Sequence, residues 1–166
     1  MKRVVITGAG TINALGFTVD QTLEAMREGR CGIGDLEFRD VERLAIRIGG
    51  QVKGYEPEES FNRQQLSLYD RFTQFTLIAA REAIGQAGLE FSGELAAKTG
   101  VVLGNSGGGM TTLDDNYRHV YEDGKNRVHP FVVPKLMNNA AAGHVSMEFN
   151  LKGPSFTVST ACASSN

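Results

Sequence analysis

The sequence has few of the features that mark secreted, membrane-spanning or nucleic-acid-binding proteins. Its two cysteines, Cys31 and Cys162, are too few for a disulfide framework and favour a reduced, cytoplasmic setting. No run approaches the roughly 18 apolar residues that a membrane-spanning helix needs, and the first apolar run is too short for a signal peptide. The net charge of −2 gives no electrostatic case for binding nucleic acid or an anionic membrane.

Metal binding is disfavoured as well. The three histidines, His119, His129 and His144, lack metal-ligand spacing with one another and with either cysteine. We interpret His144 as a structural histidine on a helix of small residues, and the other two as surface or loop residues. Cys31 has no base or motif near it in the sequence and is interpreted as structural.

Glycine, in contrast, is abundant, with 20 residues that cluster in loops. Two glycine-rich turns, at residues 8–10 and 104–109, each follow a predicted strand. Asn13 stands where a dinucleotide-binding G-x-G-x-x-G motif needs its third glycine, and no phosphate-binding G-x-x-x-x-G-K-S/T motif occurs. Nucleotide binding is therefore disfavoured. The glycines are interpreted as sites where a helix or a substrate chain approaches the backbone closely.

Strands and helices alternate along the chain, which predicts an α/β layered fold. The predicted strands are residues 4–7, buried, 46–52, at an edge, 99–104 and 155–161. The predicted helices are residues 19–28, 71–87, 110–121 and 134–149, with one or two further turns at 62–69. Capping patterns support three of them: Thr18 with Gln21, Asp70, and Pro134 as a first helical residue. The predicted apolar faces are Val19, Leu23 and Met26; Phe72, Phe75, Ala79 and Ala83; and Met137, Ala141 and Val145.

Cys162 is the strongest candidate for a catalytic residue. A β-rich run leads directly into this thiol, and its neighbours Ala161, Ala163, Ser164 and Ser165 are all small. A sharp turn at the start of a helix needs small residues, and so does the close approach of a thioester. A helix beginning here would favour the thiolate through its dipole and would offer the Cys162 backbone N–H as an oxyanion donor. The alternative is a buried structural cysteine.

Residues 158–165 closely resemble the active-site segment of β-ketoacyl-acyl-carrier-protein synthases of the elongating I/II type. Further similar segments follow in the same order as in that family: residues 3–10, 70–72, the glycines before Met110, 130–134, 142–144 and 153–155. The resemblance covers the whole chain, residues 1–166. It implies the N-terminal half of a thiolase-like fold, which is an α/β/α/β/α sandwich of two similar halves.

The chemistry implied by the resemblance is a decarboxylating Claisen condensation in fatty-acid elongation. Cys162 would accept an acyl group from acyl carrier protein, and the carbanion formed from malonyl-carrier protein would attack that thioester. No cofactor or metal is implied. The family draws two histidines, a lysine, a second oxyanion donor and a gating phenylalanine from its other half, and none of these matches a residue here. We therefore expect the 166 residues to be a fragment that cannot condense alone.

The resemblance also bears on specificity and assembly. Gly107 and Val133 fall where the family lines its acyl pocket, and glycine at position 107 predicts a roomier pocket for long or unusual acyl chains. The strand at 155–161 corresponds to the one that pairs across the two-fold axis of the family's homodimer. Two alternatives stay open: a ketosynthase of polyketide or nodulation-type lipids, and a non-catalytic chain-length-factor-like subunit. The presence of Cys162 argues against the second.

Overall fold

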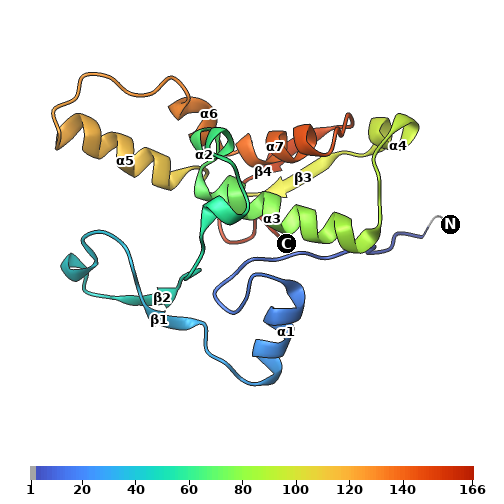
Figure 1. Cartoon of the computed structure of the whole chain (residues 1–166), viewed down its shortest axis with the longest axis horizontal. Coiled ribbons are helices and arrows are strands. Elements are labelled where there is room, and N and C mark those ends of the chain that lie inside the picture. Colours follow the sequence, from blue (N-terminus) through green and yellow to red (C-terminus); the bar gives the residue numbers. More distant parts are fainter. Residues whose placement is uncertain (1–2) are drawn as a thin grey trace. The chain divides into compact units, whose positions relative to one another are not determined.

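The computed structural model of the chain describes residues 3–166, which fall into two compact units (Figure 1). Unit 1 comprises Met1–Glu56 and Ile78–Gly88, and unit 2 comprises Pro57–Leu77 and Leu89–Asn166. The helices are α1 (Val19–Arg27), α2 (Arg63–Leu68), α3 (Arg71–Ala87), α4 (Gly93–Lys98), α5 (Met110–Tyr121), α6 (Val132–Leu136) and α7 (Ala140–Glu148). The strands are β1 (Ile33–Asp35), β2 (Ile48–Gly50), β3 (Val101–Gly104) and β4 (Ser155–Val158). None of the helices in this described part is both long enough and apolar enough to cross a membrane.

Unit 1 contains α1 and a short antiparallel pair of strands. Strand β1 pairs with β2 in the register Ile33↔Gly50, so the predicted edge strand at 46–52 forms over three residues only. Helix α1 begins as predicted, because the Thr18 hydroxyl accepts a hydrogen bond from the Gln21 N–H at 3.2 Å. The Gln21 side chain accepts from the Phe17 N–H at 2.8 Å rather than from Thr18.

The first glycine-rich turn lies against the C-terminal part of α3. A Cβ at Gly8 or Gly10 would collide with the carbonyl oxygens of Ala83 and Ala79, so both glycines permit a helix to approach closely. Glu82 then holds the neighbouring backbone, since its carboxylate accepts from the Thr11 N–H at 2.9 Å and from the Val19 N–H at 2.8 Å. The glycines at 8 and 10 are therefore used for close helix packing.

Gly10→Ala should lower the free energy of unfolding by roughly 1–3 kcal/mol, the usual cost of overpacking a close contact. The matched control is Gly85→Ala in α3, where no atom beyond the helix's own nearby backbone lies within 4 Å of the new Cβ. Alanine inside a helix is better than glycine by up to about 1 kcal/mol, so the control should be stabilised. Urea unfolding of both variants measures the difference, and equal midpoints would refute the packing argument.

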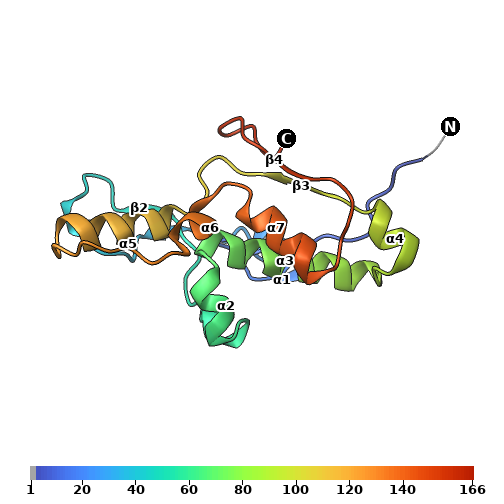
Figure 2. The same cartoon turned by 90° about the horizontal axis from the view of Figure 1, so that it is seen from above.

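Unit 2 is built on β3 and β4, which pair in parallel with Val101 opposite Ser155 and Gly104 opposite Val158. Figures 1 and 2 show the two strands side by side, with α7 running along them. Ala140, Ala141 and Ala142, a run of small residues on α7, are buried. Because small side chains let a helix lie near a sheet, this run fixes the distance between α7 and the strands.

Side-chain caps mark the beginnings of α2 and α3. Helices α3 and α5 have the predicted bounds, and α2 forms within the predicted stretch at 62–69. Asn62 and Gln65 complete a full capping box on α2. Asp70 caps α3 by accepting from the Phe72 N–H at 3.3 Å. These local bonds satisfy amide groups that a helix leaves unpaired at its N-terminus.

The predicted buried strand at residues 4–7 is wrong. This segment forms no strand, and the exposed fractions of Val4 and Ile6 are 98% and 92%. A β-branched run becomes a strand only where another strand takes up its backbone hydrogen bonds. Within the described residues the strands pair only as β1 with β2 and β3 with β4.

The single helix predicted at 134–149 is also wrong, because two helices, α6 and α7, occupy this region. Met137 between them is extended, with ψ at 137°. The neighbouring Asn138 carbonyl accepts a hydrogen bond at 3.1 Å from the side chain of Asn105, which lies after β3. A tertiary hydrogen bond thus occupies a carbonyl that, in a continuous helix, would accept from the N–H four residues later. Pro134 lies third in α6 rather than first, still within the turn where no N–H is needed.

The predicted apolar faces are only partly correct. Leu23 and Met26 on α1 are exposed, and the residue buried there is Ala25. On α3 the buried residues are Thr73, Gln74 and Leu77 rather than the predicted stripe. On α7 the predicted Ala141 and Val145 are buried, whereas Met137, before the helix, is 39% exposed.

Candidate active site

The carboxyl ends of β3 and β4 bring two segments of unit 2 together. The glycine-rich loop at 105–109 follows β3, and the turn that carries Cys162 follows β4. A Cβ at Gly104, the last residue of β3, would collide with the Ser164 carbonyl, so the end of β3 and the turn of Cys162 are in backbone contact. The Asn105 N–H donates to the Val158 carbonyl at 3.0 Å and holds the loop to β4. The structure therefore joins two segments that are more than 50 residues apart in the sequence.

Cys162 lies in a tight turn closed by short-range hydrogen bonds. The Ala163 N–H donates to the Thr160 carbonyl and the Ser164 N–H to the Ala161 carbonyl, both at 3.1 Å. The Ser164 hydroxyl donates to the Ala161 carbonyl at 2.6 Å and accepts from the Thr160 N–H at 3.0 Å. Ala161 has a φ of 49°, a left-handed conformation that costs a non-glycine residue about 1–3 kcal/mol. The turn thus stores strain directly beside the thiol.

The thiol of Cys162 is free and exposed. The alternative of a buried structural cysteine is therefore not what the structure shows. Residues 161–165 form successive turns. The bonds that close these turns are donated by Ala163, Ser164 and Asn166, so the Cys162 N–H is not used for closure.

The glycine-rich loop is held in place, although three consecutive glycines suggest a very flexible turn. The Asn105 side-chain oxygen accepts from the Gly107 N–H at 3.2 Å and from the Gly108 N–H at 3.3 Å. The Gly109 N–H donates to the Leu136 carbonyl at 3.1 Å. Gly107 is open, since the only atom near its Cβ position is the Met110 Cγ at 3.5 Å.

Val133 lies on α6, the helix whose C-terminal residues contact this loop. Its side chain is 60% exposed. Carbonyl oxygens of the same helix, at Lys135 and Leu136, lie against Gly109 and Gly108. Cys162, Gly107 and Val133 thus all belong to unit 2, on three segments linked through the glycine-rich loop.

The sequence profile of the β-ketoacyl synthase N-terminal domain matches residues 1–166. The chain belongs to this family. Nodulation protein E of Rhizobium sp. (strain N33) is 41% identical over 99% of this chain and 41% of its own length. The 3-oxoacyl-[acyl-carrier-protein] synthase 2 of Staphylococcus aureus (strain N315) is 36% identical over 98% of this chain and 39% of its own. The chain spans about two fifths of the length of these relatives.

The fold of the β-ketoacyl synthase domain is confirmed by a solved structure. The ishigamide ketosynthase/chain length factor superposes with a TM-score of 0.84 at 24% identity, over 98% of this chain and 41% of that one. The predicted α/β, thiolase-like fold class is therefore correct.

Cys31 lies in unit 1 of the domain and is exposed. Its sulfur accepts a hydrogen bond from the Ile33 N–H at 3.4 Å, a contact within its own loop. It also lines a cavity of about 500 Å³ together with Lys53. Among the described residues, no group of three histidine, cysteine or acidic side chains could hold a metal ion.

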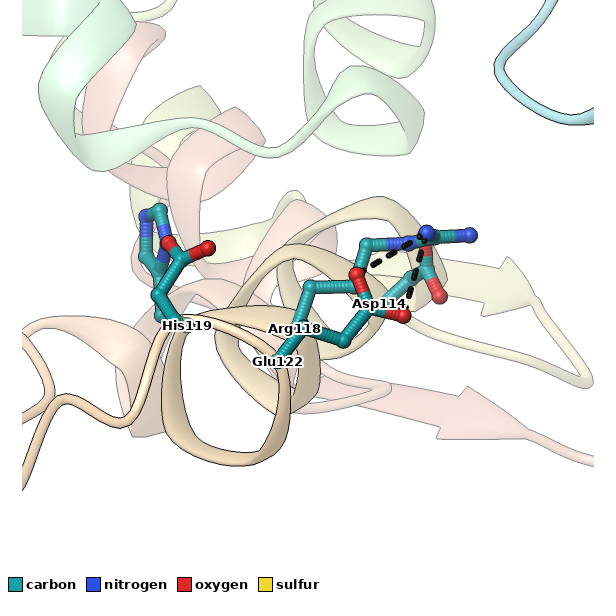
Figure 3. Close-up of polar contacts among 5 residues, drawn as sticks. Asp114, Arg118, His119 and Glu122 are labelled. Carbon is teal, nitrogen blue, oxygen red and sulfur yellow. Dashed lines mark hydrogen bonds and ion pairs between the residues drawn. The ribbon is translucent and has the colours of Figure 1, made fainter.

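Two histidines of the synthase domain are surface residues, as predicted. His119 on α5 lies 2.9 Å from the Asp123 carboxylate, and its hydrogen bond, followed by that of Lys125, lowers the pKa of Asp123. Figure 3 shows Arg118 on the same helix reaching Asp114 at 3.0 Å and Glu122 at 3.4 Å. Exposed ion pairs one turn apart stabilise a helix by only a few tenths of a kcal/mol. His129 is exposed before α6.

His144 on α7 is half-buried in an aromatic cluster. Its ring lies 4.5 Å from that of Tyr69, which in turn lies 5.6 Å from the ring of Phe61. Burial lowers the pKa of His144 below its ordinary 6.5, and the charge of Glu148 opposes this only in part. The histidine packs in its neutral form, in agreement with the structural role predicted for it.

The free energy of unfolding should therefore fall as the pH drops below about 6.5. The unfolded chain binds a proton at His144 more readily than the folded chain, so the stabilisation is complete above this pH and is lost below it. His144→Gln should reduce this dependence, measured as the change in denaturant midpoint between pH 7.5 and 5.5. His129→Gln, at an exposed ring, is the control. An unchanged slope for His144→Gln would contradict the assignment.

Sequence reasoning missed the contacts that position the site. Asp70 was recognised as the cap of α3 and as part of a segment that resembles the family, but not as a partner of α5, where its other oxygen bonds to Thr112. Asn105 and Asn138, which hold the glycine-rich loop, carried no signal beyond their frequency in turns.

Proposed function

We propose that residues 1–166 form the N-terminal, nucleophile-bearing half of a 3-oxoacyl-[acyl-carrier-protein] synthase, an acyltransferase that elongates fatty acids. The observation that carries the proposal is the free, exposed thiol of Cys162 in a strained turn beside the glycine-rich loop. In the family, the remaining catalytic groups come from the second half, which corresponds to the part of the relatives that this chain does not span.

In the first proposed step, the Cys162 sulfur attacks the thioester carbonyl of an acyl group on acyl carrier protein. The carbon–sulfur bond to the carrier breaks, and the carrier leaves as a thiol that takes the proton from Cys162. The small side chains around Cys162 leave room for the thioester. The Cys162 N–H, which does not close the turn, is free to bond the oxyanion.

In the second step, the malonyl group on a second carrier protein loses carbon dioxide. The electron pair left on its C2 carbon attacks the thioester on Cys162. The bond between acyl carbon and sulfur breaks, the thiol is regenerated by protonation, and the product is a 3-oxoacyl chain two carbons longer. Acyl carrier protein is therefore the proposed partner, with acyl and malonyl thioesters as substrates.

The proposal is tested on the full-length protein that carries this segment, incubated with acyl- and malonyl-carrier protein. Mass spectrometry should detect a 3-oxoacyl product lengthened by two carbons. Residues 1–166 alone should give none, because they provide the nucleophile without the groups that assist decarboxylation. Failure of the full-length protein to condense any acyl chain would refute the function.

A second candidate is a ketosynthase of a nodulation-type specialised lipid pathway. It is favoured by the higher identity to nodulation protein E, 41%, than to the S. aureus synthase, 36%. The open space at Gly107 suits a long or unusual acyl chain on Cys162. Comparing kcat/KM for ordinary saturated and for long unsaturated acyl-carrier proteins distinguishes the two functions.

We further propose that the active protein is a cytoplasmic homodimer in which β4 pairs with its counterpart. Phe156 and Val158 on this strand are 51% and 39% exposed, and in the described chain β4 pairs only with β3. An exposed, uncharged strand edge favours association with another strand. A monomeric mass in solution for the full-length protein would refute the dimer.

A further inference from the structure

A single buried carboxylate joins the beginnings of two helices in unit 2. Asp70 is 4% exposed and precedes α3, where its Oδ1 accepts from the Phe72 N–H at 3.3 Å. Its Oδ2 accepts from the Thr112 N–H at 2.8 Å and from the Thr112 hydroxyl at 2.6 Å. Thr112 is the third residue of α5 and is 7% exposed.

Helix α5 has no cap of its own. The residue before it is Gly109, which has no side chain to accept a hydrogen bond from the first turn. Asp70 provides that acceptor from a distant part of the sequence and places its negative charge at the positive end of the helix dipole. The position at which α5 begins is therefore set by Asp70.

The beginning of α5 is also the end of the glycine-rich loop. A Cβ at Gly109 would lie 3.1 Å from the Asp70 Oδ2 and 2.6 Å from the Lys135 carbonyl oxygen, so its backbone is held between Asp70 and α6. Gly108 lies against the Leu136 carbonyl and the Asn138 side chain, and Gly104 against the turn of Cys162. Gly107 alone among the four glycines has open space beside it.

We propose that Asp70 is a positioning residue, which fixes the glycine-rich loop that carries the exposed Gly107 and so determines which acyl chain lengths the synthase accepts. Asp70 does this through Thr112 and the glycine-rich loop, without touching the acyl chain. This inference rests on the proposed function, because it concerns the length of the acyl chain that the proposed synthase accepts. The hydrogen bonds need both carboxylate oxygens as acceptors, so even an amide at this position must turn its NH₂ toward one of the donors.

The test uses the full-length protein and the ratio of kcat/KM for long and short acyl-carrier proteins. This ratio does not depend on the fraction of enzyme that is folded, so a loss of stability alone leaves it unchanged. Asp70→Asn should change the ratio by roughly tenfold, comparable to one methylene in an apolar pocket. Thr112→Val, which removes one hydrogen bond while keeping the shape, should change it in the same direction by less. Thr112→Ser, which retains the hydroxyl, should keep the wild-type ratio.

Leu77→Val is the matched control for stability. Leu77 is a fully buried residue of unit 2 whose shortening should cost about 1 kcal/mol without touching the loop. Hydrogen exchange at the amides of Gly107, Gly108 and Gly109 provides a second measurement. Exchange should accelerate in Asp70→Asn beyond its rate in Leu77→Val.

The outcomes separate this inference from the proposed function. Equal loop exchange in Asp70→Asn and Leu77→Val overturns the positioning role, whether or not the protein condenses acyl chains. Faster loop exchange with an unchanged selectivity ratio overturns the control of chain length. A wild-type protein that forms no 3-oxoacyl product overturns the proposed function, and with it the control of chain length, while hydrogen exchange still decides whether Asp70 positions the loop.

Discussion

Cys162→Ser should abolish formation of the acyl-enzyme and reduce condensation at least about a thousandfold, as losing a covalent nucleophile usually does. A serine hydroxyl is a far weaker nucleophile than a thiol at neutral pH, and the turn around residue 162 contains no base that could activate it. The fold should be retained, because the side chain is exposed and the smaller serine hydroxyl leaves no buried cavity. Intact-mass spectrometry after incubation with acyl-carrier protein measures the acyl adduct directly.

The chain contains its own control for this experiment. Cys31 is equally free and exposed, yet it lies in unit 1, outside the unit that carries the glycine-rich loop. Cys31→Ser should keep the acyl adduct and the full rate of condensation. Should the adduct persist in Cys162→Ser and disappear in Cys31→Ser, the nucleophile would be Cys31 and the proposed mechanism would be wrong.

Helix α5 was predicted with its observed bounds from the glycines before Met110, although the acceptor for its first turn comes from the distant Asp70. Helix α3 was predicted with its observed bounds because its beginning is determined locally, by the Asp70 cap. The run at 4–7 and the stretch at 134–149 fail for the opposite reason. Whether the first becomes a strand, and where the second is interrupted, depends on partners distant in the sequence.

The features of the candidate site likewise fall into those that the sequence predicts and those that only the fold reveals. A β-rich run leading to a thiol surrounded by small residues was visible in the sequence, although the strand predicted at 155–161 ends at Val158. Parallel strands bring their carboxyl ends to one edge of the sheet. Three other features were not visible in the sequence. They are the left-handed conformation of Ala161, the hydrogen bonds from the loop to the Asn105 side chain, and the hydrogen bond between Asp70 and Thr112. Each is a geometric relation between residues whose types alone are ordinary, so only the fold reveals them.

A side chain should have different effects on stability at two neighbouring glycines, Gly104 at the end of β3 and Gly107 in the glycine-rich loop. Gly104→Ala places a Cβ against the Ser164 carbonyl and should cost roughly 1–3 kcal/mol of stability while displacing the turn of Cys162. A Cβ at Gly107 has only the flexible Met110 side chain near it, and the φ of Gly107 lies outside the left-handed region, so the fold should tolerate Gly107→Ile.

The consequence of Gly107→Ile should instead appear in substrate choice. Under the proposed function, in which the acyl chain on Cys162 passes Gly107, a bulky aliphatic side chain there should block long acyl chains. The ratio of kcat/KM for long over short acyl-carrier proteins should then fall by about 10- to 100-fold. Gly107→Ala, with a single methyl group, should produce a smaller shift in the same direction. Steady-state kinetics on the full-length protein measures both ratios. If selectivity stays at the wild-type value in both variants while Gly104→Ala destabilises the fold, the opening at Gly107 does not receive the acyl chain, and the loop serves only to support the turn of Cys162.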